Sequence, residues 1–214
     1  MLARRLFASA LLLFCAPALA GVDCSPYGRE PGIRVEIKNP EPRIQSIMAE
    51  SMQKLPLDNP RHTLGLTVAD FVIGFEFRLE STEVDGGFCT AISDIGFGMG
   101  YSGIEVFIDD RVRPGTECHA AVMEHEMEHV GIFRRVLEKY GPLIRKELEI
   151  IAMNLDPVFL EKTSERAIDG MVSNQVYESE RIRVLTGKME REKMDLNAAH
   201  DSSDEYARIG RICR

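Results

Sequence analysis

The sequence predicts one α+β domain, in which a mostly antiparallel sheet packs on a long helix and further long helices follow. Three observations carry this prediction. Residues 62–108 hold most of the strand signal, residues 117–140 form an uninterrupted helical pattern, and residues 142–214 are polar and largely helical. Strands grouped before helices are typical of the α+β class.

The first twenty residues have the features of a secretory signal. Arg4 and Arg5 give a positive start, an apolar run extends over residues 6–16, and Ala18-Leu19-Ala20 offers a small-residue cleavage site. The run is too short for a permanent membrane anchor, and no later stretch is long and apolar enough to be one. We therefore expect residues 21–214 to form a mature protein that is exported to a bacterial periplasm or secreted.

The composition narrows the classes of partner. The chain has 34 acidic and 26 basic residues, and its formal net charge is −8. An acidic chain is a poor ligand for nucleic acid or an anionic membrane. Its length suits one well-filled core rather than two.

The cysteines predict disulfides. Cys15 lies in the signal, which leaves Cys24, Cys89, Cys118 and Cys213 in the exported part. An even number in an exported chain favours two bridges, with three possible pairings. We expect Cys89 to pair with Cys118 and Cys24 with Cys213. Zinc binding by all four is the alternative, although the chain has no Cys-x-x-Cys pair.

The first half should be rich in strands. Gly32–Asn39 alternates like a half-buried strand, whereas Arg43–Leu55 has apolar residues at helical spacing and predicts a helix. Glu83–Gly87 predicts a turn. The glycines of Gly96–Gly103 could also suggest a phosphate-binding loop, but the segment lacks the ending of such a loop, so we expect a flexible turn there. Further strands are expected near residues 63–67, 71–79, 88–97 and 104–108.

A long helix is predicted over Glu117–Tyr140, where apolar side chains recur at helical spacing without a proline. The Pro114-Gly115-Thr116 turn precedes it, and Gly141-Pro142 should end it. We expect a second helix over Leu143–Leu155 and a third that restarts at Asp156-Pro157 and reaches about Ala199.

The long helix contains His125-Glu126-Met127-Glu128-His129. On a helix, His125 and His129 lie one turn apart on one face and can bind one metal ion. Glu126 could then accept a proton from a water held by that metal. The alternative is an amphipathic helix with solvated polar neighbours, but both histidines and Glu126 fall on the apolar stripe, where they need a partner.

A catalytic zinc usually takes three protein ligands and one water. The candidates for the third ligand are Glu149, twenty residues after His129, and the terminal cluster His200–Tyr206, which offers His200, Asp201 and Glu205. In the terminal cluster His200–Tyr206, residues four apart could divide the tasks of binding the metal and orienting a histidine. Tyr206 could stabilise an oxyanion, or it could be an ordinary surface or core tyrosine.

The His-Glu-x-x-His helix resembles that of the zincin metallopeptidases, in which the histidines bind zinc and the glutamate is the general base. The chain departs from the metzincins, because Ile132 and Arg135 stand where a glycine and a third histidine are expected. In its order of elements it is more similar to a bacterial family of predicted secreted zinc-dependent proteases of unknown substrate.

That family ends on an aromatic-Asp pair, a threonine and a His-Gly. Here His200-Asp201 corresponds to the pair and Asp204 to the threonine, while Tyr206-Ala207 replaces His-Gly. The resemblance implies a zincin-like fold with Zn²⁺ as cofactor. With it, we expect Asp201 first as the third ligand, then His200, with Glu205 and Glu149 behind them.

The expected function is that of an exported zinc metallopeptidase, in which a zinc-bound water activated by Glu126 hydrolyses peptide bonds of a protein or peptide substrate. The alternative is an inactive zincin-like envelope protein that binds a partner through its long acidic helices. An enzyme needs an open metal position in a cleft, whereas a binding module needs an exposed apolar stripe on the helix over residues 156–199.

Overall fold

The computed structural model describes residues 22–48, 51, 63–161 and 179–214, so the predicted signal at 1–20 lies outside the described residues. The described elements follow the order η1 (Ser25–Tyr27), β1 (Gly32–Lys38), β2 (Arg43–Ile47), β3 (Gly65–Val84), β4 (Gly87–Asp109), α2 (Glu117–Ala152), β5 (Val158–Leu160), α4 (Glu180–His200) and α5 (Ser203–Ile212). The strand predicted over Gly32–Asn39 is confirmed as β1.

Strand β4 is the centre of the sheet. One edge of β4 pairs antiparallel with β3, and the other edge pairs in turn with β5, β1 and β2. The prediction of a mostly antiparallel sheet is wrong, because both pairings along the path β1-β4-β2 are parallel. Two reversals of chain direction separate β2 from β4, and they return β4 to the direction of β1 and β2.

Strands β3 and β4 form a hairpin of 20 and 23 residues. Its turn at Asp85-Gly86 confirms the predicted turn, and Gly86 has a φ of 82° that favours glycine. The predicted turn at Gly96–Gly103 is wrong, since this segment lies inside β4, and the short strands predicted around it merge. Gly100 has a φ of 143°, and a Cβ there would clash with the carbonyl oxygen of Lys38.

The helix predicted at Glu117–Tyr140 is confirmed, but it is longer than predicted. Thr116 caps it by accepting a hydrogen bond of 3.1 Å from the backbone N–H of His119. The helix passes through Gly141-Pro142 and ends at Ala152. At Gly141 it packs so closely on β1 that a Cβ would lie 2.5 Å from Ile37 Cδ1. Tertiary packing therefore overrides the local breaking signal.

Two other helix predictions are wrong within the described residues. Arg43–Ile47, predicted as the start of a helix, is strand β2, and residues 49–50 and 52–55 of that prediction lie outside the described residues. Val158–Leu160 is strand β5, residues 162–178 are not described, and α4 begins only at Glu180. Pairing with the edge of β4 decides both strands, and no local pattern reports it.

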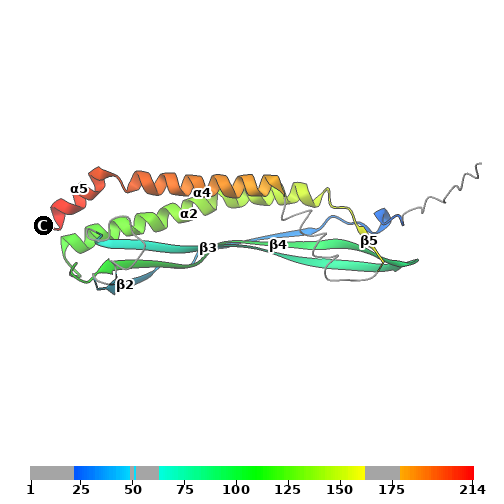
Figure 1. Ribbon diagram of the computed structural model, residues 1–214, viewed down its shortest axis with the longest axis horizontal. Coiled ribbons are helices and arrows are strands. Elements are labelled where there is room, and N and C mark those ends of the chain that lie inside the picture. Colours follow the sequence, from blue (N-terminus) through cyan, green and yellow to red (C-terminus); the bar gives the residue numbers. More distant parts are fainter. Residues whose placement is uncertain (1–21, 49–50, 52–62, 162–178) are drawn as a thin grey trace, which may run out of the picture.

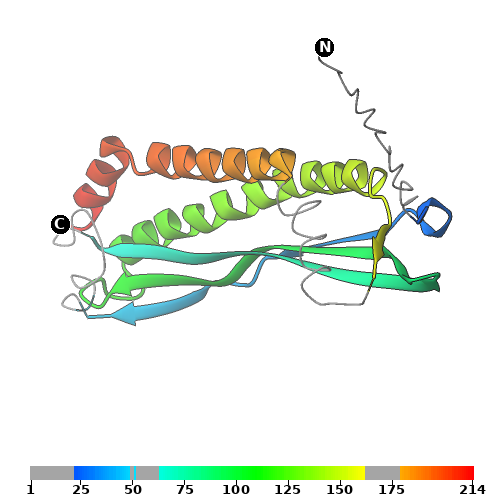
Figure 2. The same ribbon diagram turned by 45° about the vertical axis from the view of Figure 1, so that its right-hand side comes forward.

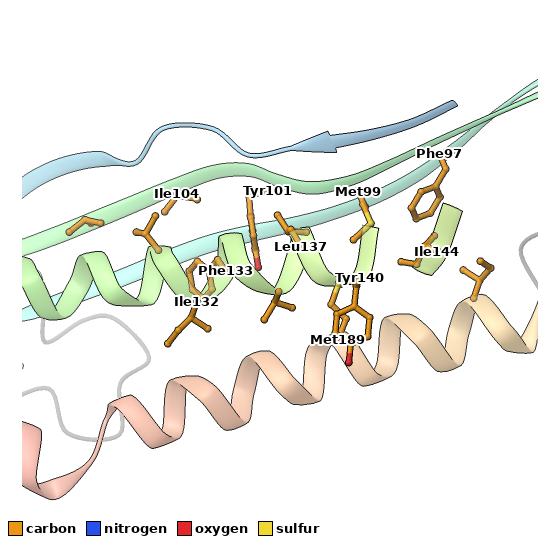
Figure 3. Packing of buried hydrophobic residues seen from close by; sticks show 14 of the residues in the cluster. Phe97, Met99, Tyr101, Ile104, Ile132, Phe133, Leu137, Tyr140, Ile144 and Met189 are labelled. Atoms are coloured by element: carbon orange, nitrogen blue, oxygen red, sulfur yellow. The ribbon is translucent and has the colours of Figure 1, made fainter. Parts of the chain in front are cut away.

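The molecule is elongated and layered. Helix α2 lies along one face of the sheet and α4 runs back along α2, so that α5 ends beside the first turns of α2 (Figures 1 and 2). Phe97, Met99 and Tyr101 of β4 point toward α2, which adds Leu137 and Ile144 to the core (Figure 3). None of the described helices combines the length and the apolar composition needed to cross a bilayer.

The structure contains two disulfides, as predicted, but the predicted pairing is wrong. Cys24 pairs with Cys89, with a Cα–Cα distance of 5.4 Å, and Cys118 pairs with Cys213, at 4.7 Å. The first bridge joins the segment of η1 to β4, and the second joins the C-terminal end of α5 to the start of α2. Bridges of this kind indicate an oxidising compartment.

Candidate metal site

Three parts of the chain meet at one end of the molecule. The early turns of α2, the link between α4 and α5, and the start of β3 come together there, because α4 returns antiparallel along α2 (Figure 1). Ser202 caps α5 by accepting a hydrogen bond of 3.2 Å from the backbone N–H of Glu205. The Cys118–Cys213 bridge fastens α5 to α2.

His125 and His129 lie next to each other on α2, with ring centroids 5.0 Å apart. His125 is buried, and burial lowers the pKa of its imidazole, which favours the neutral form that binds metals. His200, at the end of α4, lies beside them. The ligand-type atoms of these three histidines are within 4.8 Å of one another, so the group could hold a metal ion.

Asp201 faces both histidines of α2. Its Oδ1 atom lies 3.2 Å from His125 Nε2 and 3.3 Å from His129 Nε2. Tyr206 donates a hydrogen bond of 3.1 Å from its hydroxyl to the same oxygen. The first residue predicted as third ligand therefore reaches the two histidines.

His200 lies differently from Asp201. Its ring stacks on that of His125, with centroids 4.3 Å apart and an angle of 22° between the planes. Its Nε2 atom lies 3.1 Å from the backbone oxygen of His125, which can only accept a hydrogen bond. In this arrangement Nε2 of His200 carries the proton and donates it.

Glu126 is buried between α2 and β3, and only 3% of its surface is exposed. Thr67 Oγ1 lies 2.7 Å from Glu126 Oε2 and 3.0 Å from the backbone oxygen of the same residue. Burial raises the pKa of the Glu126 carboxyl to about 7, although the Thr67 hydroxyl opposes this shift. At Gly65 a Cβ would lie 2.5 Å from Glu126 Oε1, so β3 approaches this closely only with glycine there.

The second nitrogen of each α2 histidine faces α4 or α5. His129 Nδ1 lies 2.6 Å from Asn197 Oδ1 on α4. His125 Nδ1 is buried without a hydrogen-bond partner among the described residues, and Glu205 Oε1 is 3.6 Å away. Hydrogen bonds from Arg208, 2.6 and 2.8 Å long, lower the pKa of Glu205 to about 2.

The structure separates the two remaining ligand candidates from the Nε2 atoms of His125 and His129. Glu205 faces Nδ1 of His125, whereas Asp201 faces Nε2, and both Glu205 oxygens are engaged by Arg208. Glu149 is on α2, twenty residues beyond His129, which on a continuous helix corresponds to about 30 Å. The predicted helical hairpin that would have returned Glu149 to the site does not form.

Sequence reasoning missed Gly65, Thr67 and Asn197. Each is common in its type of element, and each matters here only because of the side chain that the fold brings against it. Asn197 lies three residues before His200, just outside the terminal cluster that the sequence singles out. No local signal distinguishes it from a solvated residue of a polar helix.

Comparisons of this chain with protein-family models, with curated proteins and with solved structures find no match. The function is therefore inferred from the residues of the site.

Proposed function

We propose that this chain is an exported zinc-dependent peptidase whose metal is held by His125, His129 and Asp201. The observation that carries the proposal is the position of Asp201 Oδ1, 3.2 and 3.3 Å from the two Nε2 atoms. A tetrahedral zinc with bonds of about 2.0–2.1 Å keeps its ligand atoms about 3.3–3.4 Å apart. Two imidazoles and one carboxylate are also a ligand set that catalytic zinc uses.

The geometry favours Asp201 over His200 as the third ligand. An imidazole nitrogen binds a metal along a lone pair that lies in the plane of the ring. Because the rings of His200 and His125 are stacked and nearly parallel, their lone pairs do not converge on one point. Nε2 of His200 is also engaged by the backbone oxygen of His125.

Glu126 is the general base of the proposal. Zinc, when bound, lowers the pKa of a coordinated water and polarises a carbonyl group. A carboxyl with a pKa of about 7 can take up a proton at neutral pH and release it again to a leaving amine. Thr67 holds the carboxylate through Oε2 and thus orients the group that moves the proton.

Tyr206 supports the ligand rather than the base. Burial raises the pKa of its hydroxyl to about 12, so this group keeps its proton at neutral pH. It donates to Asp201 Oδ1, which helps to hold the carboxylate in the position that faces the two histidines. A role for Tyr206 in oxyanion stabilisation would require it to leave Asp201.

The start of β3 supports a peptide as substrate. Along Gly65–Ala69, β3 pairs with β4 on one edge, and no described strand pairs with its other edge. An extended peptide can add to such an edge through main-chain hydrogen bonds. Thr67 belongs to this stretch and contacts Glu126, so a peptide held there would pass close to the general base.

The rival function, an inactive module that binds a partner through its helices, receives less support. It requires an exposed apolar stripe on the helix predicted over residues 156–199, whose described part is α4. The exposed large apolar residues of the described part of this helix, 180–200, are Val184, Met194 and Leu196. At 3.6 residues per turn these three point in different directions around the axis, so they form no stripe.

The metal site is tested by the zinc content of the purified exported protein and of three variants. We expect about one zinc per chain in the unchanged protein, its loss in His125→Ala and Asp201→Ala, and its retention in His200→Ala. Zinc lost with His200→Ala but kept with Asp201→Ala would exchange the roles of these two residues. A protein without zinc, purified in the absence of chelators, would refute the proposal.

The peptidase activity is tested with the zinc-loaded protein and a mixture of synthetic peptides, whose cleavage is followed by mass spectrometry. The Glu126→Gln variant should bind zinc and leave the peptides intact. Cleavage that is equal in both proteins would contradict the proposed role of Glu126 as the general base.

A further inference from the structure

We infer that Asn197 is a positioning residue, which fixes the tautomer of His129 so that its Nε2 atom is free to bind the metal. This inference rests on the proposed function of the site. It concerns a residue of α4 that does not itself face the metal-binding atoms. The contact that suggests it is the distance of 2.6 Å between His129 Nδ1 and Asn197 Oδ1.

The orientation of the Asn197 amide follows from its second contact. Its Nδ2 atom lies 2.8 Å from the backbone oxygen of Lys193, which can only accept a hydrogen bond. The nitrogen of the amide must therefore face Lys193, since the opposite orientation would set two acceptors against each other. This leaves Oδ1, an acceptor, facing His129.

The protonation of His129 follows from the same network. Because Asn197 Oδ1 can only accept, the Nδ1 atom of His129 carries the proton and donates it. The neutral ring then has its lone pair on Nε2, the atom that lies 3.3 Å from Asp201 Oδ1. A chain of two hydrogen bonds, anchored on the backbone of α4, thus presents the correct nitrogen to the metal.

Within the part of the chain that the structure describes, His125 has no equivalent partner. Its Nδ1 atom has Glu205 at 3.6 Å, beyond the usual length of a hydrogen bond, and Glu205 is engaged by Arg208. The two α2 histidines are therefore held unequally, and Asn197 is the partner that keeps one of them in register with Asp201. Loss of such a hydrogen-bond partner typically weakens metal binding about 10–100-fold.

The experiment measures zinc affinity and the tautomer of His129 in the full exported chain. Asn197→Leu keeps the approximate shape of the side chain but cannot accept a hydrogen bond, whereas Asn197→Asp restores an acceptor. Asn154→Leu is the matched control, because the Asn154 amide also donates to the carbonyl four residues earlier, 2.6 Å away at Ile150, and forms no hydrogen bond with any histidine of the described residues. Zinc affinity is measured by competition with a chelator of known affinity.

The tautomer is read from the ¹⁵N chemical shifts of the His129 ring in the zinc-free protein. If Asn197 had only a structural role, its substitution would leave these shifts unchanged. We expect the Nδ1–H form in the unchanged protein, in Asn197→Asp and in Asn154→Leu. Asn197→Leu should show a mixture of tautomers and bind zinc about 10–100-fold more weakly. Asn197→Asp keeps an acceptor toward His129 but loses the donor toward Lys193, so we expect it to recover part of the affinity.

Two outcomes would overturn the inference. One is an unchanged tautomer and zinc affinity in Asn197→Leu, and the other is an Asn197→Asp variant that binds zinc as weakly as Asn197→Leu. If the unchanged protein binds no zinc at all, the proposed function fails instead, while the tautomer measurement still decides the role of Asn197.

Discussion

The two halves of helix α2 bury different kinds of side chain. The first half buries His125 and Glu126 beside apolar residues, whereas every buried residue of the second half, from Val136 to Ala152, is apolar or aromatic. The second half packs on β4 and α4 as an ordinary core (Figure 3). Buried polar groups need partners, so their concentration at one end marks where the fold maintains a site rather than only a core.

The two halves of α2 also have different effects on the position of α4. Packing along the second half of α2 holds α4 in place over many turns, and α4 then delivers Asn197, His200 and Asp201 to the first half (Figure 1). The early turns of α2 should therefore govern metal binding and catalysis, and the later turns should govern stability.

The largest effect on catalysis without an effect on stability is expected at Glu126. Glu126→Gln should lower the rate of peptide hydrolysis about 10²–10⁴-fold, because a positioned general base typically contributes that much. Zinc content and thermal stability should hardly change, since the amide fills the same space. Glu124→Gln, at a side chain that is 75% exposed, is the control and should retain activity. Full activity in Glu126→Gln would mean that another group acts as the base.

The opposite result is expected in the second half of the helix. Leu148 is fully buried, and Leu148→Ala should lower the free energy of unfolding by about 2–5 kcal/mol. Leu143→Ala, on the same helix but 43% exposed, should have little effect. Urea unfolding of the zinc-free proteins measures this, because bound zinc would add its own stabilisation. A folded Leu148→Ala variant that has lost its affinity for zinc would contradict the assignment of stability alone to the second half of α2.

Local patterns predict the helix of the metal motif, strand β1 and the β3–β4 turn, because these depend on spacing and turn chemistry within a few residues. The parallel placement of β1 and β2 beside β4 depends on contacts between distant segments. The strand at Arg43–Ile47 shows the limit, since its helical spacing is overridden by pairing with residues 105–109. The disulfide pairing fails for the same reason.

The site follows the same rule. His125, Glu126 and His129 are predicted because one helix fixes their spacing, and Asp201 because it lies in the terminal cluster that resembles the Asp-containing motif of the secreted zinc-dependent proteases. Asn197 and Thr67 could not be predicted, because their roles follow from the return of α4 along α2 and from the approach of β3.

The two disulfides should both stabilise the fold, but only one of them lies beside the candidate metal site. Replacing Cys118 and Cys213 by serine, or Cys24 and Cys89, should in each case lower the free energy of unfolding by about 2–4 kcal/mol. The bridged residues are 95 and 65 positions apart, which changes the entropic contribution by only about 0.3 kcal/mol.

Only loss of the Cys118–Cys213 bridge should also weaken zinc binding, because this bridge holds α5, and with it Tyr206 and Glu205, against α2. Chelator competition at a temperature where both variants are folded measures the effect. Equal zinc affinity in the two variants would show that α5 stays in place without its bridge.

The smallest effect is expected at Asp109, a second buried carboxylate, which ends β4 and lies on the path to α2. Burial alone would raise its pKa, as it does for Glu126, but hydrogen bonds from Arg111 outweigh burial and lower the pKa of Asp109 below its usual 3.8. A carboxyl with a lowered pKa stabilises the fold above about pH 3.8, and this contribution is lost as the pH falls through the folded-state pKa.

Asp109→Asn should therefore reduce stability at neutral pH, by about 1 kcal/mol or less for a pair with an exposed arginine, and the difference from the unchanged protein should shrink in acid. Acid unfolding of the zinc-free proteins measures this, because metal binding depends on pH itself. Zinc affinity and peptide hydrolysis should stay unchanged. If Asp109→Asn impaired zinc affinity or hydrolysis, Asp109 would contribute to the site although its carboxylate is paired with Arg111. The opposite pKa shifts of Glu126 and Asp109 would then no longer distinguish a catalytic carboxylate from a structural one.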